Sequence, residues 1–346
     1  MNDELKVGIL SGGGDAPGIN AVIRAVVRRG IQSYDYDFIG MRDGWRGPLE
    51  RKFFPLDLKV TSGILPRGGS ILGTSRTNPF KQKNGPKKIL KNAEKTGIGV
   101  VVVIGGEDTL GVAYKMSELG LKCVGVPKTI DNDLAGTDYT FGFHTAVAIA
   151  TEALDRLHTT AEAHHRVMIL EVMGRHTGWI ALEAGLAGGA DAILIPEKPF
   201  DIDEVCDYIK QRQERGRNFS TIVIAEGAKP KGGAEIVYGK GVDEFGHVRF
   251  GGVGYYIGKE IEEQTGIETR VVILGHIQRG GSPTAFDRIL ATRYGVAAVD
   301  LVHNGKFGYM VALKGNKIVA VPLKDVAGKR KTVDLKLYNI AKIFFG

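Results

Sequence analysis

Several features that define common protein classes are scarce or missing in this sequence. The chain of 346 residues contains two cysteines, Cys123 and Cys206, which cannot form a disulfide framework. Cys123 lies within an apolar run, which indicates a buried reduced thiol. No apolar run approaches the ~18 residues that a membrane-spanning helix needs, and the N-terminus has no signal-peptide layout. These absences predict a cytoplasmic protein that does not bind membranes.

Cationic residues are in excess, but they do not form a long block. The formal net charge is +7 and the sequence pI is about 9.2, which suits polyanionic partners such as nucleic acids or small phosphorylated substrates. A basic stripe with interleaved aromatic residues is missing, so a nucleic-acid-binding module is not favoured. We interpret the densest run, GKRK at 328–331, as a solvated surface segment.

Short β-branched runs alternate with amphipathic segments along most of the chain. Buried strands are predicted at 5–10, 37–41, 99–106 and 122–127, and helices at 17–31, 86–97 and 108–120. The first of these helices has Pro17 in its first turn and Gly30 near its end. A second series of the same kind begins near residue 143. The alternation predicts an α/β fold with two doubly wound, mainly parallel sheets.

Two glycine-rich turns follow predicted strands. SGGGDAPGIN at 11–20 lets backbone N–H groups converge on an anion at a helix start, although it lacks the Walker A and G-x-G-x-x-G spacings. The alternative is a glycine-rich turn without a ligand. GGEDT at 105–109 places an acid where it can bind Mg²⁺, and the alternative is an ordinary helix cap.

Carboxylates and arginines also gather at predicted strand ends. PKTIDND at 127–133 places several acidic or amide groups on one turn, where an aspartate beside a substrate hydroxyl can act as general base. The alternative is a turn that asparagine and aspartate stabilise by themselves. Arg166, Arg175, Arg270 and Arg279 all lie near strand ends, which suits a phosphate clamp, although any one of them can instead form a surface salt bridge.

Together and in this order, the motifs resemble the phosphofructokinase family. The matching stretches run from near residue 5 to about residue 300 and are GGGDAPGIN, GGEDTLG, TIDND with GTDYTFGF, EVMGRHTGW, AEG and GHIQRGG. The resemblance implies an enzyme of glycolysis that uses Mg²⁺ to phosphorylate fructose 6-phosphate. A sugar-phosphate sensor without activity would need a broken base or metal position, but Glu107, Asp131 and Asp133 are all present.

The resemblance also implies a role for individual positions. Asp131 would take the proton from the 1-hydroxyl of the sugar, Glu107 would help to bind Mg²⁺, and Gly14 would lie against the phosphoryl donor. Arg76 would contact the transferred phosphoryl group, and Arg166 would reach a neighbouring subunit's site, which implies a homo-oligomer (dimer or tetramer). Fructose 6-phosphate would meet Thr129, Ile130, Asp131, Met173, Gly174, Arg175, Glu226, Arg270, His276, Ile277, Gln278 and Arg279.

Two positions bear on the choice of donor. Family members that use ATP usually carry glycine where this chain has Asp108 and Lys128. Asp108 would repel the α-phosphate of ATP, by about 1 kcal/mol in water and several at lower effective dielectric, whereas Lys128 would add a cation beside the transferred group. The pair resembles the pyrophosphate-dependent branch, and Glu107 resembles the branch in which both donors occur. Pyrophosphate is therefore the predicted donor and ATP the alternative.

The resemblance leaves allosteric regulation open. Arg24, Arg28, Arg215 and Arg217 match basic positions of the effector site in bacterial ATP-dependent members, but His158 stands where an arginine is usual. We predict two Rossmann-like domains with helices on both faces of each sheet and the site in the cleft between them. The phosphoryl-donor domain would comprise 1–142 plus about 278–328, and the sugar-phosphate domain 143–277 plus about 329–346.

Overall fold

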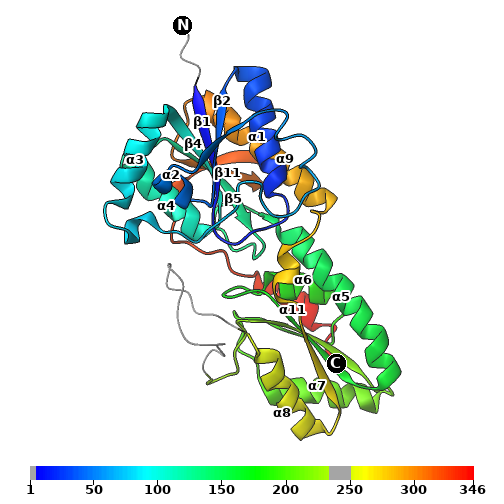
Figure 1. Cartoon of the computed structure of the whole chain (residues 1–346). Coiled ribbons are helices and arrows are strands. Elements are labelled where there is room, and N and C mark those ends of the chain that lie inside the picture. The colour runs from blue at the N-terminus through cyan, green and yellow to red at the C-terminus, as the bar shows by residue number, and fades with distance from the viewer. Residues whose placement is uncertain (1–4, 234–250) are drawn as a thin grey trace.

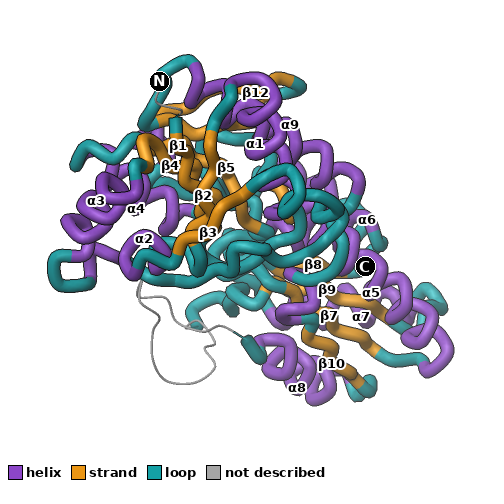
Figure 2. Tube along the Cα trace, turned by 45° about the horizontal axis from the view of Figure 1, so that its top comes forward, coloured by secondary structure: helices purple, strands orange, loops and turns teal. Residues whose placement is uncertain are grey.

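The molecule has two lobes, each built around one β-sheet (Figure 1). The structure is a computed structural model that describes residues 5–233 and 251–346. In Figure 2 the strands of both sheets lie inside and the helices lie outside. Within the described residues, no helix has the length and apolar character needed to cross a membrane. The predicted fold class, α/β with two mainly parallel sheets, is confirmed.

The first sheet has eight strands in the order β12-β11-β5-β4-β1-β2-β3, with β6 paired to β5 outside this path. The edge strands β3 and β12 run antiparallel to their neighbours, and the other pairs are parallel. The strands are β1 (Lys6–Ser11), β2 (Asp37–Met41), β3 (Phe53–Leu56), β4 (Ile98–Gly105), β5 (Cys123–Thr129), β6 (Phe141–Gly142), β11 (Tyr309–Lys314) and β12 (Lys317–Pro322).

Alternate residues of the central strand β4 explain how the first sheet is covered. Val100 and Val102 pack with α1 (Ile19–Tyr34) and α9 (Ala285–His303) on one face. Val101 and Val103 pack on the other face. This second face is covered by α2 (Arg46–Glu50), α3 (Gly85–Thr96), α4 (Glu107–Glu118) and α10 (Leu323–Val326). Because both faces are buried, β4 is an almost continuous valine run rather than an alternating one.

The second sheet has four parallel strands in the order β10-β7-β9-β8. They are β7 (Val167–Val172), β8 (Ala192–Leu194), β9 (Ser220–Ala225) and β10 (Thr269–Ile273). One face packs against α5 (Phe143–His164), α6 (Trp179–Ala187) and α11 (Leu335–Lys342). The other packs against α7 (Ile202–Glu214) and α8 (Val253–Thr265). Two short 3₁₀ helices, η1 (Pro79–Lys81) and η2 (Gly275–Arg279), complete the described elements.

The first helix differs from its prediction at both ends. Pro17 lies before α1 rather than in its first turn, because Gly18 is the N-cap with a left-handed φ of 107°. Gly30 lies inside the helix, which continues to Tyr34. A Cβ atom on Gly30 would come within 2.2 Å of the Phe38 ring. The glycine therefore makes room for strand β2 and does not end the helix.

The chain crosses between the lobes three times. It passes from β6 into α5, returns from η2 into α9, and crosses again between α10 and α11. Strands β11 and β12 join the first sheet, whereas α11 packs against α6 and β8. This arrangement is what a donor domain of 1–142 plus 278–328 requires, and the domain boundaries themselves stay a prediction.

Candidate active site

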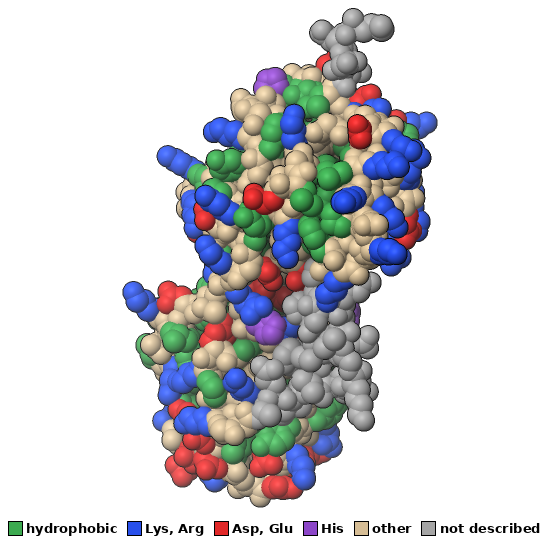
Figure 3. Space-filling model, turned by 90° about the vertical axis from the view of Figure 1, so that its left-hand side faces the viewer, with side chains coloured by type: hydrophobic (Ala, Val, Ile, Leu, Met, Phe, Trp, Pro, Cys, Tyr) green, Lys and Arg blue, Asp and Glu red, His purple; other side chains and the backbone are tan. Residues whose placement is uncertain are grey.

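One pocket lies where the carboxyl ends of the strands from both sheets meet. Turns that follow β1, β4, β5, β7 and β9 contribute to it, as expected for open α/β sheets. Figure 3 shows the hollow between the two lobes, with acidic and basic side chains at its mouth. The pocket is lined by Gly13, Gly14, Arg76, Gly106, Glu107, Asp108, Thr109, Lys128, Thr129, Asp131, Asp133, Met173, Arg175, His176, Glu226, Arg279 and Arg330.

The glycine-rich turn after β1 packs directly against Arg279. Arg279 Nη1 donates a hydrogen bond to the carbonyl of Asp15 at 3.1 Å. A Cβ atom on Gly14 would lie 2.5 Å from the same nitrogen. Glycine is therefore required at position 14 for the guanidinium of Arg279 to approach the turn. A residue predicted for the sugar phosphate thus touches the turn predicted for the donor.

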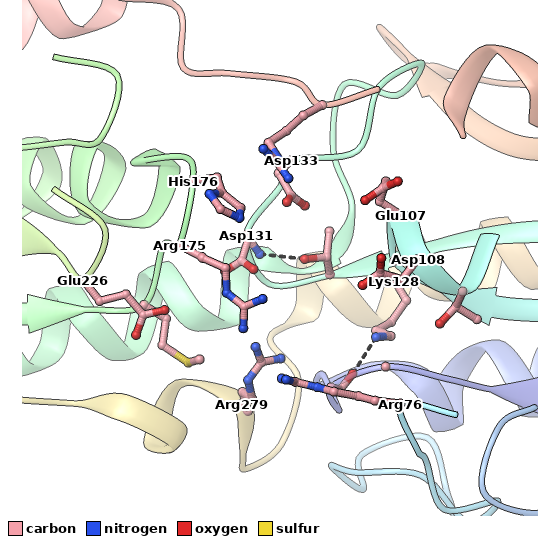
Figure 4. Close-up of a pocket in the computed structure, with 17 residues that line it drawn as sticks. Arg76, Glu107, Asp108, Lys128, Asp131, Asp133, Arg175, His176, Glu226 and Arg279 are labelled. Atoms are coloured by element: carbon pink, nitrogen blue, oxygen red, sulfur yellow. Dashed lines mark hydrogen bonds between the residues drawn. The ribbon is translucent and has the colours of Figure 1, made fainter. Parts of the chain in front are cut away.

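Lys128 is the buried cation of the pocket. Its side chain is 3% exposed, and its Nζ donates to the carbonyl of Gly14 at 2.5 Å. Burial, with the nearby cations Arg279 and Arg76, lowers the pKa of Lys128 to about 7. An anion bound at this nitrogen would raise the pKa again and favour the ammonium form. Lys128, Asp108 and Asp131 all line the same pocket (Figure 4).

The turn after β5 is held by its own polar groups. Thr129 Oγ1 accepts a hydrogen bond from the backbone N–H of Asp131 at 3.0 Å, and Thr140 Oγ1 donates to the carbonyl of Thr129 at 2.7 Å. Burial and the neighbouring Asp131 carboxylate raise the pKa of Asp133 to about 6. Asp131 Oδ1 is buried, and none of the described residues forms a hydrogen bond with it. A buried acceptor of this kind calls for a donor group, and a substrate hydroxyl supplies one.

The acidic residues at the start of α4 face Asp133 across the pocket (Figure 4). Glu107 Oε1 accepts a hydrogen bond from the backbone N–H of Gly328 at 3.1 Å. Among residues 5–233 and 251–346, no three His, Cys, Asp or Glu side chains gather closely enough to hold a metal ion alone. Mg²⁺ is usually held by one or two carboxylates together with substrate phosphates. One or two of the carboxylates of Glu107, Asp108 and Asp133 therefore suffice for a metal whose coordination is completed by the donor.

The sugar side of the pocket is formed by the second sheet. Met173 and Arg175 follow β7, and Glu226 follows β9. Burial, together with the Asp131 carboxylate, raises the pKa of Glu226 to about 7. A Cβ atom on Gly227 would lie 1.9 Å from the carbonyl oxygen of Arg175, so this glycine lets the two turns approach each other.

Several residues predicted to contact the sugar do not line the pocket. The side chain of Ile130 is fully buried in the core. Gln278 is also fully buried, and its amide oxygen accepts from the backbone N–H of Met173 at 3.3 Å, so it positions a lining residue. Ile277 is 65% exposed. Gly174 and His276 also lie outside the lining set.

Arg166 and Arg270 lie away from this pocket, at the amino ends of β7 and β10. Arg166 Nε forms a salt bridge with Glu268 Oε2 at 2.5 Å, and Arg270 pairs with Glu268 and Glu262. Within one chain Arg270 does not line the pocket that Arg279 lines, and its role at the 6-phosphate stays a prediction. The sequence pattern places Arg166 and Arg270 at the starts of their predicted strands, and Arg175 and Arg279 after the ends. Only the second pair lines the pocket.

Sequence reasoning missed two basic residues that line the pocket. His176 lines the pocket next to Arg175, and its place inside the EVMGRHTGW motif was an available signal. Arg330 lines the pocket from the C-terminal segment, and Lys331 is half-buried and hydrogen-bonded. The interpretation of 328–331 as a solvated segment holds for the exposed Arg330, which also lines the pocket, but it is wrong for Lys331. No local pattern marks them, because their partners lie far away in the sequence.

Comparison with known proteins agrees with this geometry. The family model described as phosphofructokinase matches residues 6–302. The chain belongs to the phosphofructokinase family. The glycine-rich turn, the acidic turn after β5 and the MGR segment that form the pocket all fall within the matched range.

Its relatives differ in the donor that their names give. A Streptomyces coelicolor protein named pyrophosphate–fructose 6-phosphate 1-phosphotransferase is 59% identical, over 99% of this chain and 100% of the relative. A protein named ATP-dependent 6-phosphofructokinase 3, from the same organism, is 53% identical over 95% of this chain and 96% of the relative. The crystal structure of Pichia pastoris phosphofructokinase in the T-state superposes with a TM-score of 0.85 at 32% sequence identity. The match covers 99% of this chain and 37% of the longer Pichia pastoris chain.

Proposed function

We propose that this protein transfers a phosphoryl group from pyrophosphate to the 1-hydroxyl of fructose 6-phosphate. The products are fructose 1,6-bisphosphate and phosphate, and the reaction is reversible. The observation that carries the proposal is that Asp108, Lys128 and Asp131 line one pocket. The pyrophosphate-dependent relative at 59% identity supports the donor.

In the proposed reaction, Asp131 is the general base. The oxygen of the 1-hydroxyl attacks the phosphorus while its proton moves to Asp131, and the bond from phosphorus to the leaving phosphate breaks. Phosphoryl transfer needs positioning and cationic stabilisation more than covalent chemistry. Arg76 and Lys128, which line the donor side, are placed to stabilise the charge on the transferred group.

Donor selection follows from charge at the start of α4. The carboxylate of Asp108 would lie near the α-phosphate of a nucleotide and repel it. Pyrophosphate has no nucleoside to anchor it, so the buried amine of Lys128 and the backbone of Gly13 and Gly14 supply contacts. The alternative donor is ATP, and the ATP-dependent relative at 53% identity is the observation that favours it.

Mg²⁺ fits the carboxylates of Glu107, Asp108 and Asp133. When bound, the metal would offset the negative charge of the phosphate oxygens. This chain's own part is to hold those carboxylates in place, which the hydrogen bond from Gly328 to Glu107 does on one side.

We also infer that the protein works as a homo-oligomer, a dimer or tetramer. Arg166 and Arg270 lie side by side, because each forms a salt bridge with Glu268, and both lie away from this chain's own pocket. A second copy of the chain that brought its Arg166 and Arg270 to this pocket would add two guanidinium groups for the 6-phosphate. Mixing inactive Asp131→Asn subunits with inactive Arg166→Ala subunits should restore activity in hybrids. Restored activity is impossible if each site is complete within one chain.

The donor is tested by assaying purified protein with fructose 6-phosphate, Mg²⁺ and either pyrophosphate or ATP, side by side. We expect turnover with pyrophosphate and little with ATP. The variant Asp108→Gly should raise the ratio of ATP to pyrophosphate activity. Turnover of the wild type with ATP alone would overturn the donor assignment, and an unchanged ratio in the variant would show that Asp108 does not exclude ATP.

A further inference from the structure

The crossing between α10 and α11 runs along the edge of the pocket. We call residues 327–334 the C-terminal strap, and it can be followed in Figure 1 as the chain that descends from the upper lobe to α11. The backbone N–H of Gly328 donates to Glu107 at 3.1 Å, and that of Val333 donates to Glu197 Oε1 at 2.9 Å. Glu197 in turn accepts from the N–H of Gly178, before α6. The strap is thus fastened to both lobes.

Lys331 lies at the middle of the strap and binds the turn after β5. Its backbone N–H donates to the carbonyl of Asp133 at 2.8 Å. Its Nζ donates to Asn132 Oδ1 at 2.9 Å and to the carbonyls of Thr137 at 3.1 Å and Asp138 at 2.6 Å. The three donors of the ammonium group therefore have partners on one short segment, which begins with the residue after Asp131.

The second lobe holds Lys331 from the other side. Trp179 Nε1 donates to the carbonyl of Lys331 at 3.2 Å, and the ammonium lies 5.2 Å from the centre of the same indole ring. An ammonium over an indole face is attracted by the ring. Burial lowers the pKa of Lys331 to about 8, so the group stays mainly charged at neutral pH.

Asn132 is the residue through which this contact reaches the site. It adopts a left-handed backbone conformation with φ 51°. Residues other than glycine rarely adopt this conformation, and asparagine is among those that tolerate it best. Its side chain is 1% exposed, and its Oδ1 also accepts from the backbone N–H of Thr140 at 3.1 Å. This conformation sets the direction of the chain between Asp131 and Asp133, both of which line the pocket.

We propose that Lys331 is a positioning residue for phosphoryl transfer, because it holds Asn132 and so aims Asp131 into the pocket. The proposal rests on the proposed role of Asp131 as general base. A residue that only stabilised the fold would join the two lobes without touching the site. Lys331 also binds the turn that carries Asp131. A displacement of about 1 Å at the base can cost roughly 100-fold in rate.

The test compares kcat and KM of Lys331→Met with those of the wild type. We expect kcat to fall by roughly 10- to 100-fold, while KM for fructose 6-phosphate changes by less than about 3-fold. The matched control is Lys329→Met on the same strap, whose exposed side chain forms a salt bridge with Asp325 at 4.0 Å. This control should keep wild-type values for both constants.

A double-mutant cycle with Asn132→Gly identifies the route. Glycine keeps the left-handed conformation available but removes the Oδ1 acceptor that Asn132 offers to Lys331. If Lys331 acts through Asn132, the double variant loses no more activity than the more damaged single variant. Multiplicative losses, or an Asn132→Gly variant as active as the wild type, would overturn the proposal. If Lys331→Met fails to fold, the Asn132→Gly single variant still tests the proposal, because its activity must then fall below that of the wild type.

Amide hydrogen exchange measures the stability of the segment after β5 without an activity assay. Peptides that cover 129–140 should exchange faster in Lys331→Met than in the wild type or in Lys329→Met. Unchanged exchange in these peptides would overturn the proposal whichever donor the enzyme uses. A wild type that is inactive with both pyrophosphate and ATP would instead overturn the proposed function, so the two failures are distinguishable.

Discussion

The buried amine of Lys128 makes donor binding depend on pH in a way that Lys128→Met should remove. The pKa of Lys128 in the free enzyme is about 7, lowered first by burial and then by Arg279. Lysine is charged below its pKa, and an anionic donor favours the charged form. If only the ammonium form binds, one group with this pKa predicts a loss of affinity of roughly 50-fold between pH 7 and pH 9.

Isothermal titration with pyrophosphate and Mg²⁺, in buffers of different ionisation enthalpy, measures both affinity and proton uptake. Wild-type binding above pH 7 should take up close to one proton more than binding to Lys128→Met, in which only the ligand's own titration remains. At pH 7 the variant should bind roughly 10- to 100-fold more weakly, as expected for a lost charged hydrogen bond. The matched control is Lys122→Met, an exposed lysine beyond the other end of the same strand.

Stability provides an independent measurement of the same group. The pKa of Lys128 is depressed in the folded state, so between about pH 7 and pH 10.5 the unfolded chain binds more protons and stability rises with pH. Lys128→Met should therefore be more stable than the wild type at pH 7. This advantage should shrink by up to about 3 kcal/mol between pH 7 and pH 9. Equal proton uptake and equal pH dependence in both proteins would refute the reasoning.

Three further predictions concern the other side chains of the pocket. Asp131→Asn should lower kcat by roughly 10²- to 10⁴-fold with little change in the Kd of fructose 6-phosphate, and a large rise in that Kd would argue against a base. The pKa of Glu226 is about 7, so its carboxylate is lost as the pH falls; KM for fructose 6-phosphate should rise up to roughly 10-fold per pH unit below 7, and Glu226→Gln should abolish this dependence. Gly14→Ala should raise KM for both substrates, because its Cβ would lie 2.5 Å from Arg279. Gly111→Ala, where nothing lies within 4 Å, is the control, and equal KM values in the two variants would contradict the steric argument.

The central strands could be predicted from the sequence because both of their faces are buried, which gives continuous apolar runs. Most helices that cover the sheets could be predicted from their amphipathic pattern. The strand predicted at 99–106 is β4 shifted by one residue, and that at 37–41 is β2. The antiparallel edge strands β3 and β12 were not predicted. The helix α9 was also missed; it begins at a Thr284 cap and buries the polar residues Asp287 and Tyr294 in its core-facing surface, so its apolar pattern is weak.

The site could be predicted as far as it depends on single strand ends. Glu107 follows β4, whereas Lys128 lies near the carboxyl end of the neighbouring parallel strand β5 and Asp131 follows that strand, so these carboxyl ends had to converge. Lys331 binds Asn132 across 199 positions of sequence, and no local pattern encodes that contact. Arg166 and Arg270 show the opposite problem, since their residue type fits a phosphate clamp but their position places them at the amino ends of their strands.

The distribution of charge explains how one pocket can accept two polyanions. The pocket is lined by five acidic and five lysine or arginine side chains, so their formal charges cancel. The acidic side chains are Glu107, Asp108, Asp131, Asp133 and Glu226. The basic ones are Arg76, Lys128, Arg175, Arg279 and Arg330. Figure 4 shows the carboxylates of Glu107, Asp108 and Asp133 on one side and the guanidinium groups of Arg76, Arg175 and Arg279 on the other. Phosphate oxygens belong on the guanidinium side and a divalent cation on the carboxylate side. Such a pocket should bind pyrophosphate weakly without Mg²⁺, because the carboxylates then repel the donor with their full charge.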